Sequence, residues 1–300
     1  MTMELRHLRY FVAVADHLSF TRAAQHLHLA QQSLSQQIAA LERDLGIRLF
    51  DRDTRGTRLT QAGQVFLPEA RAVLARADAA VVVAQRAGRG EIGRLNLAFL
   101  SSTANYMLPP VVRALRERLP GLELTTHNVQ VDELVAGLRD GRFDAAFTRP
   151  PLVGDLATRM LATEPVCAVL PAGHRLADRA GLRLEDLADE DWVLSPRASW
   201  PPWHAKYDRD FAAAGFTPRV VQRATGVANL LGLVAAGVGV TRLALSANSV
   251  RRTGVVFVPL AGERAETVVA WMPALDGPVQ RNFLDVLADL AATSELTRWG

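Results

Sequence analysis

Apolar residues in the first 45 positions recur at spacings of three and four, the period of helices that bury one face. Three such stretches follow one another, at 5–18, 20–27 and 30–45. Ser19 supplies a hydroxyl N-cap for the second stretch, and Gly46 ends the third. Because very few residues separate the last two helices, the pattern predicts a helix-turn-helix.

Two strand-like runs, 47–52 and 57–60, follow around a glycine and predict a hairpin or wing. The alanine-rich stretch 60–88 then predicts one long amphipathic helix, which ends at the glycines of 88–90. A helix of this length beside a small domain needs a partner for its apolar side, so we expect it to pair two chains. The alternative is that it packs against its own chain.

Beyond residue 91 strand-like and helical segments alternate, which favours a two-layered α/β fold with a parallel sheet. In the first unit, strands are expected at 95–100, 122–128 and 143–148, and helices at 108–119 and 132–138. In the second unit, we expect strands at 166–170 and 238–243 and a helix at 227–236, whereas a strand at 268–272 and a helix at 279–291 return to the first unit.

The composition indicates a globular protein, because 49% of the 300 residues are hydrophobic and 22% are charged. The longest apolar runs, 79–84 and 230–240, are too short or too interrupted by glycine to span a bilayer. Charges are scattered through the first apolar stretch, unlike the core of a secretory signal, so we expect a cytoplasmic protein with no membrane partner.

The basic residues are concentrated near the N-terminus. Residues 1–94 contain 13 arginines against 9 acidic residues, whereas residues 95–300 contain 21 basic residues against 22 acidic ones. A basic excess on the helix-turn-helix segment favours contact with nucleic acid.

The outward face of the third helix is polar but uncharged, which suits hydrogen bonding to base edges in a major groove. Its members are Gln31, Gln32, Ser33, Ser35, Gln36 and Gln37. Arginines on the wing suit phosphates or the minor groove, and these are Arg48, Arg52, Arg55 and Arg58. The competing interpretation is that all these side chains are merely solvated.

Hydroxyl groups follow two of the predicted strands and suggest capture of an anion. The residues 101–103 lie between a strand and a helix, and Thr225 and Gly226 precede another helix in the same manner. Arg149 ends a further strand of the first unit. An anion held between two helix starts would bridge the units, although the hydroxyls also suit simple helix caps.

Catalytic and metal motifs are not found. The chain has no P-loop, and the 237–239 glycines lack the strand–helix context of a dinucleotide site. His26 and His28 lie two apart on a helix and point in different directions, so no metal pair is expected. The single cysteine, Cys167, lies in an apolar run and is expected in the core. We therefore expect no enzyme activity, no metal and no cofactor.

The sequence resembles those of the LysR-type transcriptional regulators. The motifs that carry the resemblance are LRYFVAVA at 8–15, SFTRAAQHL at 19–27, LSQQIAALE at 34–42, LFDR at 49–52 and LTQAG at 59–63, with DGRFDAA at 140–146 and LVAAGVGV at 233–240. The resemblance covers nearly the whole chain and is strongest over the first 63 residues.

The resemblance implies an N-terminal all-α winged helix-turn-helix domain at 1–61, a linker and dimerisation helix at 62–90, and an effector-binding domain at 91–300. This last domain would comprise two Rossmann-like subdomains, as in type 2 periplasmic binding proteins: subdomain I at about 91–163 and 267–300, and subdomain II at about 164–266. It further implies dimers that assemble into tetramers, bind two sites on double-stranded promoter DNA and respond to a small effector, often by changing the DNA bend.

Carried over residue by residue, the resemblance assigns DNA contacts to Thr21, Gln31, Gln32, Ser35, Gln36, Arg52 and Arg55. It assigns effector contacts to Ser101, Ser102, Val131, Arg149 and Thr225. Where many relatives have Ser-Gln-Pro at the start of the recognition helix, this chain has Ala30, Gln31 and Gln32, and Gln36 replaces a frequent arginine. Glutamine favours adenine over guanine, so we expect an altered site preference.

Val131 stands where some relatives present a hydroxyl, so a carboxylate effector would depend more on Ser102 and Arg149. The effector is expected to be a small carboxylate, aromatic or otherwise. An aromatic cluster, Trp200, Trp203 and Tyr207, lines the same cleft or packs on its rim. Two other functions remain open: an enzyme that uses the α/β domain, and an architectural DNA binder that has lost its ligand.

Overall fold

The computed structural model describes residues 3–53, 56–274, 276–293 and 296. It divides into two compact units, the head (residues 1–86) and the sensor (residues 87–300). Over the described residues, no helix combines the length and the apolar character that crossing a membrane requires.

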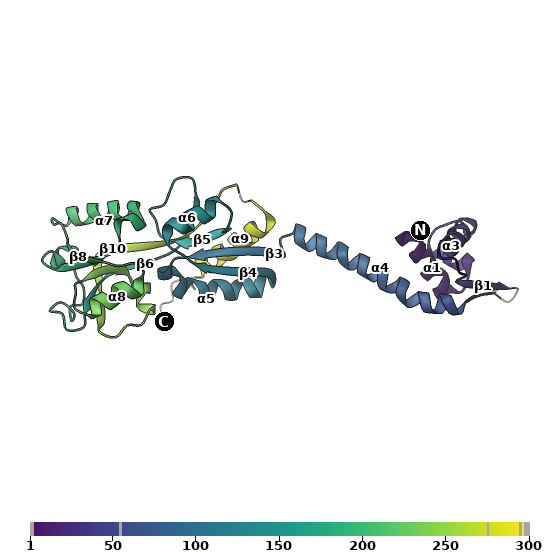
Figure 1. Cartoon of the computed structure of the whole chain (residues 1–300), viewed down its shortest axis with the longest axis horizontal. Helices are drawn as coiled ribbons and strands as arrows, with labels where there is room; N and C mark the ends of the chain where they lie inside the picture. Colours follow the sequence, from purple (N-terminus) through teal and green to yellow (C-terminus); the bar gives the residue numbers. More distant parts are fainter. Residues whose placement is uncertain (1–2, 54–55, 275, 294–295, 297–300) are drawn as a thin grey trace. The chain divides into compact units, whose positions relative to one another are not determined.

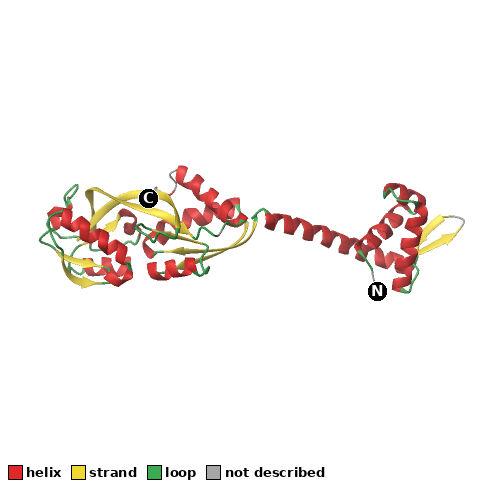
Figure 2. Ribbon diagram, turned by 90° about the horizontal axis from the view of Figure 1, so that it is seen from above, coloured by secondary structure: helices red, strands yellow, loops and turns green. Residues whose placement is uncertain are grey.

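The head contains the three helices, the hairpin and the long helix that the sequence predicts. Its elements are α1 (Leu5–His17), α2 (Phe20–His26), α3 (Gln31–Leu45), β1 (Phe50–Asp53), β2 (Gly56–Leu59) and α4 (Gln61–Gly88), whose last residues belong to the sensor. The core side chains include Leu8, Phe11, Val14, Phe20, Leu34, Ile38, Leu41 and Phe50. Figure 2 shows the hairpin projecting beyond the helices.

Local hydrogen bonds and one close backbone approach fix these boundaries. The Ser19 hydroxyl accepts the Arg22 N–H at 3.3 Å and so caps α2, and Gly46 ends α3 with a φ of 70°. The Thr60 hydroxyl accepts the Gly63 N–H at 2.9 Å at the start of α4. A Cβ on Gly63 would lie 2.2 Å from the Leu49 carbonyl oxygen, so glycine allows α4 to pack directly on the wing.

The sensor is built around a six-stranded sheet in the order β4-β3-β5-β10-β6-β9, with a separate pair of strands β7 and β8. Its strands are β3 (Ile92–Phe99), β4 (Gly121–Asn128), β5 (Ala145–Thr148), β6 (Ala157–Pro171), β7 (Asp191–Leu194), β8 (Arg219–Arg223), β9 (Thr241–Ala244) and β10 (Val255–Trp271). Its helices are α5 (Ser101–Arg118), α6 (Val131–Arg139), α7 (Pro201–Ala213), α8 (Val227–Ala235) and α9 (Pro278–Ala292), with 3-10 turns η1 (Leu184–Leu187), η2 (Arg197–Ser199) and η3 (Leu245–Ser249).

The expectation of a parallel sheet is wrong for the central strands. Strands β3, β4 and β5 are mutually parallel as expected, but β10 runs antiparallel to both β5 and β6, and β6 runs antiparallel to β9. The reason is that β6 and β10 are long strands of opposite direction that run through both halves of the sensor (Figure 1). The sequence pattern identified only the short apolar segments 166–170 and 268–272 of these strands.

The sensor has two lobes, each with its own core. In the first lobe, apolar clusters cover both faces of the sheet. Leu97 and Phe99 of β3 belong to the cluster with α5 and α9, whereas Ala98 belongs to the cluster with α6. In the second lobe, α7 and α8 cover apolar clusters that include Trp192 and Leu231. The cores of both lobes include residues from β6 and β10.

Two helices differ from the prediction. Helix α5 begins at Ser101, seven residues before the predicted start, and contains Pro109 and Pro110 in its interior. Those prolines are the reason that the pattern placed its start too late. Helix α7 was not predicted, because its sequence has two prolines and an irregular apolar pattern.

Candidate functional site

The recognition helix α3 presents amides to solvent at its N-terminal end. Gln31, Gln32 and Gln36 are exposed, whereas Leu34 and Ile38 on the opposite face are fully buried. Each exposed amide offers both a donor and an acceptor. The arrangement suits hydrogen bonding to a partner outside the chain.

Two other polar residues of α3 face inward. The Ser35 hydroxyl oxygen is buried and has no hydrogen-bond partner within the described residues. The Gln37 Oε1 atom lies 3.0 Å from His7 Nε2. Because His7 Nδ1 accepts the Glu4 N–H, His7 Nε2 carries the proton and donates to Gln37. Gln37 is therefore held by α1, and the Ser35 hydroxyl does not face solvent.

The remaining predicted DNA contacts lie on α2 and the wing. Thr21 is exposed on α2. The Arg52 backbone pairs with Thr57 across the hairpin, but its side chain and all of Arg55 lie outside the described residues. Glu42, to which the sequence pattern assigned no role, ties α3 to the wing, because its Oε1 accepts the N–H groups of Leu49 and Phe50 at 2.8 and 3.1 Å.

Helix α4 exposes several apolar side chains in the single chain. Five valines are among its exposed side chains: Val65, Val73, Val81, Val82 and Val83. Exposed apolar side chains in such number are typical of a helix that packs against another chain.

A cavity of about 520 Å³ lies between the two lobes of the sensor. Its lining includes all five predicted effector residues, Ser101, Ser102, Val131, Arg149 and Thr225, which come from four separate segments of the chain. The structure thus brings these residues together around one space.

Three helices begin at the wall of this cavity. Helix α5 begins at Ser101, α6 at Val131 and α8 at Val227, directly after Gly226 in its left-handed N-cap conformation. The first N–H groups of a helix have no partner within the helix, and the helix dipole is positive at this end. Three such ends around one cavity favour an anion over a cation.

The Arg149 side chain on the cavity wall is already paired with a buried carboxylate. Its Nη2 donates to Glu164 Oε1 at 2.7 Å and to the Ser246 hydroxyl at 3.0 Å. Glu164 lies within β6 with its side chain 1% exposed, and its Oε2 accepts the Ser246 N–H at 2.5 Å. The positive charge of Arg149 is therefore balanced before any ligand binds.

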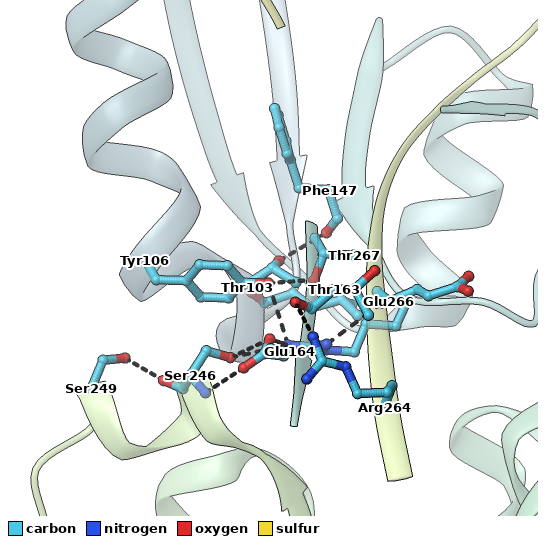
Figure 3. A network of polar contacts seen from close by, with 12 residues as sticks. Thr103, Tyr106, Phe147, Thr163, Glu164, Ser246, Ser249, Arg264, Glu266 and Thr267 are labelled. Carbon is cyan, nitrogen blue, oxygen red and sulfur yellow. Dashed lines mark hydrogen bonds and ion pairs between the residues drawn. The ribbon is translucent and has the colours of Figure 1, made fainter. Parts of the chain in front are cut away.

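Tyr106 extends this network to the sheet strand β10. Its hydroxyl accepts from Arg149 Nη2 at 3.3 Å and forms a short contact with the Thr267 hydroxyl. Burial raises the pKa of Tyr106, so the phenol stays protonated at neutral pH. Figure 3 shows Tyr106, Glu164, Ser246 and Thr267 pointing toward one another from α5, β6, η3 and β10.

Glu164, Tyr106 and Ser246 were not predicted from the sequence as residues of this site. A usable signal existed for Glu164, which is a single acidic residue within the otherwise uncharged segment 160–171. A charged residue in a buried strand needs a partner. Nothing in the local pattern distinguishes Tyr106 or Ser246 from ordinary core and cap residues.

The cavity wall carries more basic than acidic side chains. The basic ones are Arg149, Lys206, Arg209, Arg242 and Arg264, and the acidic one is Glu266. Besides Arg149, two of these cations have carboxylate partners behind the wall: Lys206 binds Asp210 at 2.7 Å, and Arg242 binds Asp210 and Glu263 at 3.0 and 2.5 Å. Burial raises the pKa of Glu263, and the Arg242 charge partly opposes this effect.

The aromatic cluster divides between the cavity and the core. Trp203 and Tyr207 of α7 line the cavity, and the Tyr207 ring stacks on the Arg242 guanidinium at 4.7 Å from the ring centre. Trp200 packs in an apolar cluster instead and is 7% exposed. The cavity therefore combines flat aromatic walls with basic groups.

The described residues offer no catalytic pair. Ser195 Oγ lies 3.3 Å from His204 Nε2, but that nitrogen also lies 3.0 Å from the Pro196 carbonyl, which can only accept. Nε2 therefore carries a proton and cannot take one from Ser195. Burial raises the pKa of the Cys167 thiol to about 11, so it is a poor nucleophile. No three metal-binding side chains gather among the described residues.

Comparisons with known proteins identify the same two parts. The family described as "Bacterial regulatory helix-turn-helix protein, lysR family" matches residues 5–64, and "LysR substrate binding domain" matches residues 88–292. The chain is 33% identical over 287 residues to the HTH-type transcriptional regulator AlsR of Bacillus subtilis (strain 168), with 95% of each chain covered. It is 36% identical over 292 residues to the HTH-type transcriptional regulator CatR of Pseudomonas putida, with 96% of this chain and 100% of CatR covered.

The fold is similar to a solved regulator–DNA complex. The match to full-length CbnR complexed with its target DNA has a TM-score of 0.82 and 27% sequence identity, and it covers 96% of this chain and 100% of CbnR.

Proposed function

Because the chain belongs to the LysR family of bacterial regulators, we propose that it reads promoter DNA through α3 and the wing under the control of a small anionic effector between the sensor lobes. The protein is a DNA-binding transcription regulator with an effector-binding domain, and it is not an enzyme. The proposal adds the contact residues, the class of effector and the way in which the effector acts, by changing promoter affinity or DNA bend.

We assign base contacts to Thr21, Gln31, Gln32 and Gln36, because their side chains are exposed on α2 and α3. On the basis of the sequence, we also assign the wing residues Arg52 and Arg55 contacts to phosphate or to the minor groove. Ser35 is left out of the set, since its hydroxyl is buried. The solved CbnR complex with target DNA supports the general mode of binding.

The observation that carries the effector proposal is the cavity, where Ser101, Ser102, Val131, Arg149 and Thr225 meet beside three helix N-termini. Since Glu164 balances Arg149, the attraction for an anion comes from the helix ends, the Ser102 hydroxyl and the remaining N–H groups of Arg149. The Trp203 and Tyr207 rings favour a flat ligand. We propose a small carboxylate, with aromatic acids as the first class to test.

The test is calorimetric titration of the full-length protein with a panel of small aromatic and aliphatic carboxylates. We expect at least one acid to bind, and Ser102→Ala to weaken its affinity about tenfold, as loss of a hydrogen bond to a charged group does. The matched control is Thr125→Ala, which removes an exposed hydroxyl on β4 and should leave affinity unchanged. Failure of every acid to bind, or equal affinity in Ser102→Ala, would contradict the proposal.

We further propose the domain boundaries 1–61, 62–90 and 91–300, with the subdomains divided near residues 163/164 and 266/267. The exposed valines of α4 would pair two chains, and dimers would assemble into tetramers that span two promoter sites in the cytoplasm. Light scattering of the purified protein measures this directly, and a monomer at micromolar concentration would overturn it.

A further inference from the structure

Trp200, at the N-terminal end of α7, is buried in the core of the opposite lobe. It belongs to the apolar cluster of the first lobe that contains Leu134 and Val135 of α6. Its indole Nε1 donates to the Pro151 carbonyl at 2.7 Å. Trp200 thus connects α7 to the chain segment that follows β5.

Trp203 makes a second connection to the same segment. Its Nε1 donates to the Arg149 carbonyl at 3.1 Å, and its ring packs against the first-lobe cluster while also lining the cavity. An indole N–H can only donate, so both tryptophans need these carbonyls to remain buried without cost.

The other end of α7 is fixed in the second lobe. Phe211 is buried there against Trp192, with ring centres 4.8 Å apart, and Tyr207 stacks on Arg242. Figure 1 shows α7 and α6 on the same side of the long strands β6 and β10, which join the lobes covalently. One helix therefore has its side chains in the cores of both lobes.

We propose that Trp200 and Trp203 form a clasp that holds the lobes together on the α7 side of the cavity, so that the lobes separate there only when both indoles release. Separation exposes the Trp200 ring to water and breaks two hydrogen bonds, whereas the strands β6 and β10 need only bend. Arg149 links the clasp to the polar network, because its carbonyl accepts from Trp203 while its side chain binds Glu164. The clasp does not depend on the identity of the effector.

The test is hydrogen–deuterium exchange, followed by mass spectrometry, on the full-length protein without added ligand. The variants are Trp200→Phe, Trp203→Phe and the double variant, which keep an aromatic ring but remove the N–H. Trp271→Phe is the matched control, since Trp271 packs against the other first-lobe cluster, which contains neither Trp200 nor Trp203. Peptides that cover 150–156 and 200–207 report on the clasp, and the core strand 95–99 reports on global stability.

Each single variant is expected to speed exchange in the clasp peptides about fivefold and the double variant more than tenfold, with strand 95–99 unchanged. Trp271→Phe should exchange like the wild type in the clasp peptides. Wild-type exchange in the double variant would overturn the proposal. An equal acceleration in strand 95–99 would also overturn it, because the tryptophans would then support the fold as a whole. Neither outcome bears on whether a carboxylate effector binds.

Discussion

The head and the sensor arrange their polar side chains in opposite ways. In the head, the amides proposed to read DNA come from one helical turn and a half, and they are exposed. In the sensor, the predicted cavity residues are spread over more than 100 positions, from Ser101 to Thr225. One of them, Arg149, already pairs with the buried carboxylate of Glu164.

This difference separates function from stability in one unit and joins them in the other. Because the α3 amides are exposed and are proposed to contact DNA, we expect their loss to change recognition and to leave the fold intact. The sensor groups stabilise the fold and shape the cavity together, so their loss acts on both. Four experiments test this contrast, and they follow in order of decreasing effect.

Glu164→Ala is expected to have the largest effect. It leaves the largely buried Arg149 guanidinium without its counter-charge, and breaking a buried ion pair costs about 3–5 kcal/mol. In a unit of this size the sensor's unfolding midpoint should fall by roughly 10 °C, measured by scanning calorimetry. The double variant Arg149→Ala/Glu164→Ala should recover part of the loss, because no unpaired charge remains. An unchanged unfolding midpoint would show that this cavity network does not stabilise the sensor.

Gly63→Ala tests the close packing of α4 on the wing. Its new Cβ would meet the Leu49 carbonyl oxygen, so α4 and the wing have to move apart, at a cost of about 1–3 kcal/mol. Gly88→Ala is the matched control, since a Cβ there meets nothing within 4 Å. Denaturant titration compares the two variants, and equal stability would show that the close approach is not required.

Arg52→Ala and Gln36→Ala separate anchorage from base reading. Loss of Arg52 should weaken binding to specific and random DNA alike and lower the salt slope by about 1. Loss of Gln36 should cost about 1–3 kcal/mol on the specific site alone. Fluorescence anisotropy at several stated salt concentrations measures both. If the two variants lose equal affinity on both DNAs, α3 does not read bases.

The smallest effect is expected at Cys167 in the sensor. With its pKa raised to about 11, only about 0.1% of the thiol is ionised at pH 8. Alkylation of the native protein by iodoacetamide should be negligible at pH 8 and should increase as the pH approaches 11. Rapid labelling at pH 8, followed by mass spectrometry, would show that the core around Cys167 opens.

The head was predictable because its information is local. Capping by Ser19, the stop at Gly46 and the apolar period of α3 each lie within a few residues of the structure they specify. What the sequence did not reveal is which polar residues of α3 turn inward, since Gln37 is oriented by His7, 30 positions away.

The sensor was predictable only in part. The hydroxyl segment 101–103 and the helix start at Val227 have local signals, and the cavity does form beside them, although the start of α5 was predicted seven residues too late. The direction of β10 depends on pairing with β5 and β6, which are distant in sequence. Glu164 was overlooked because its partners, Arg149 and Ser246, lie 15 and 82 residues away. Long-range pairing of this kind leaves no periodic pattern.

We propose that the head reads particular promoter sequences. The most direct measurement is a genome-wide footprint of the protein on the chromosome of its own organism, at a stated salt concentration and with random DNA as competitor. We predict discrete sites that share a sequence and disappear in Gln36→Ala, one of them beside the protein's own gene. Diffuse occupancy that random DNA removes equally well would contradict the claim and favour a sequence-tolerant architectural protein.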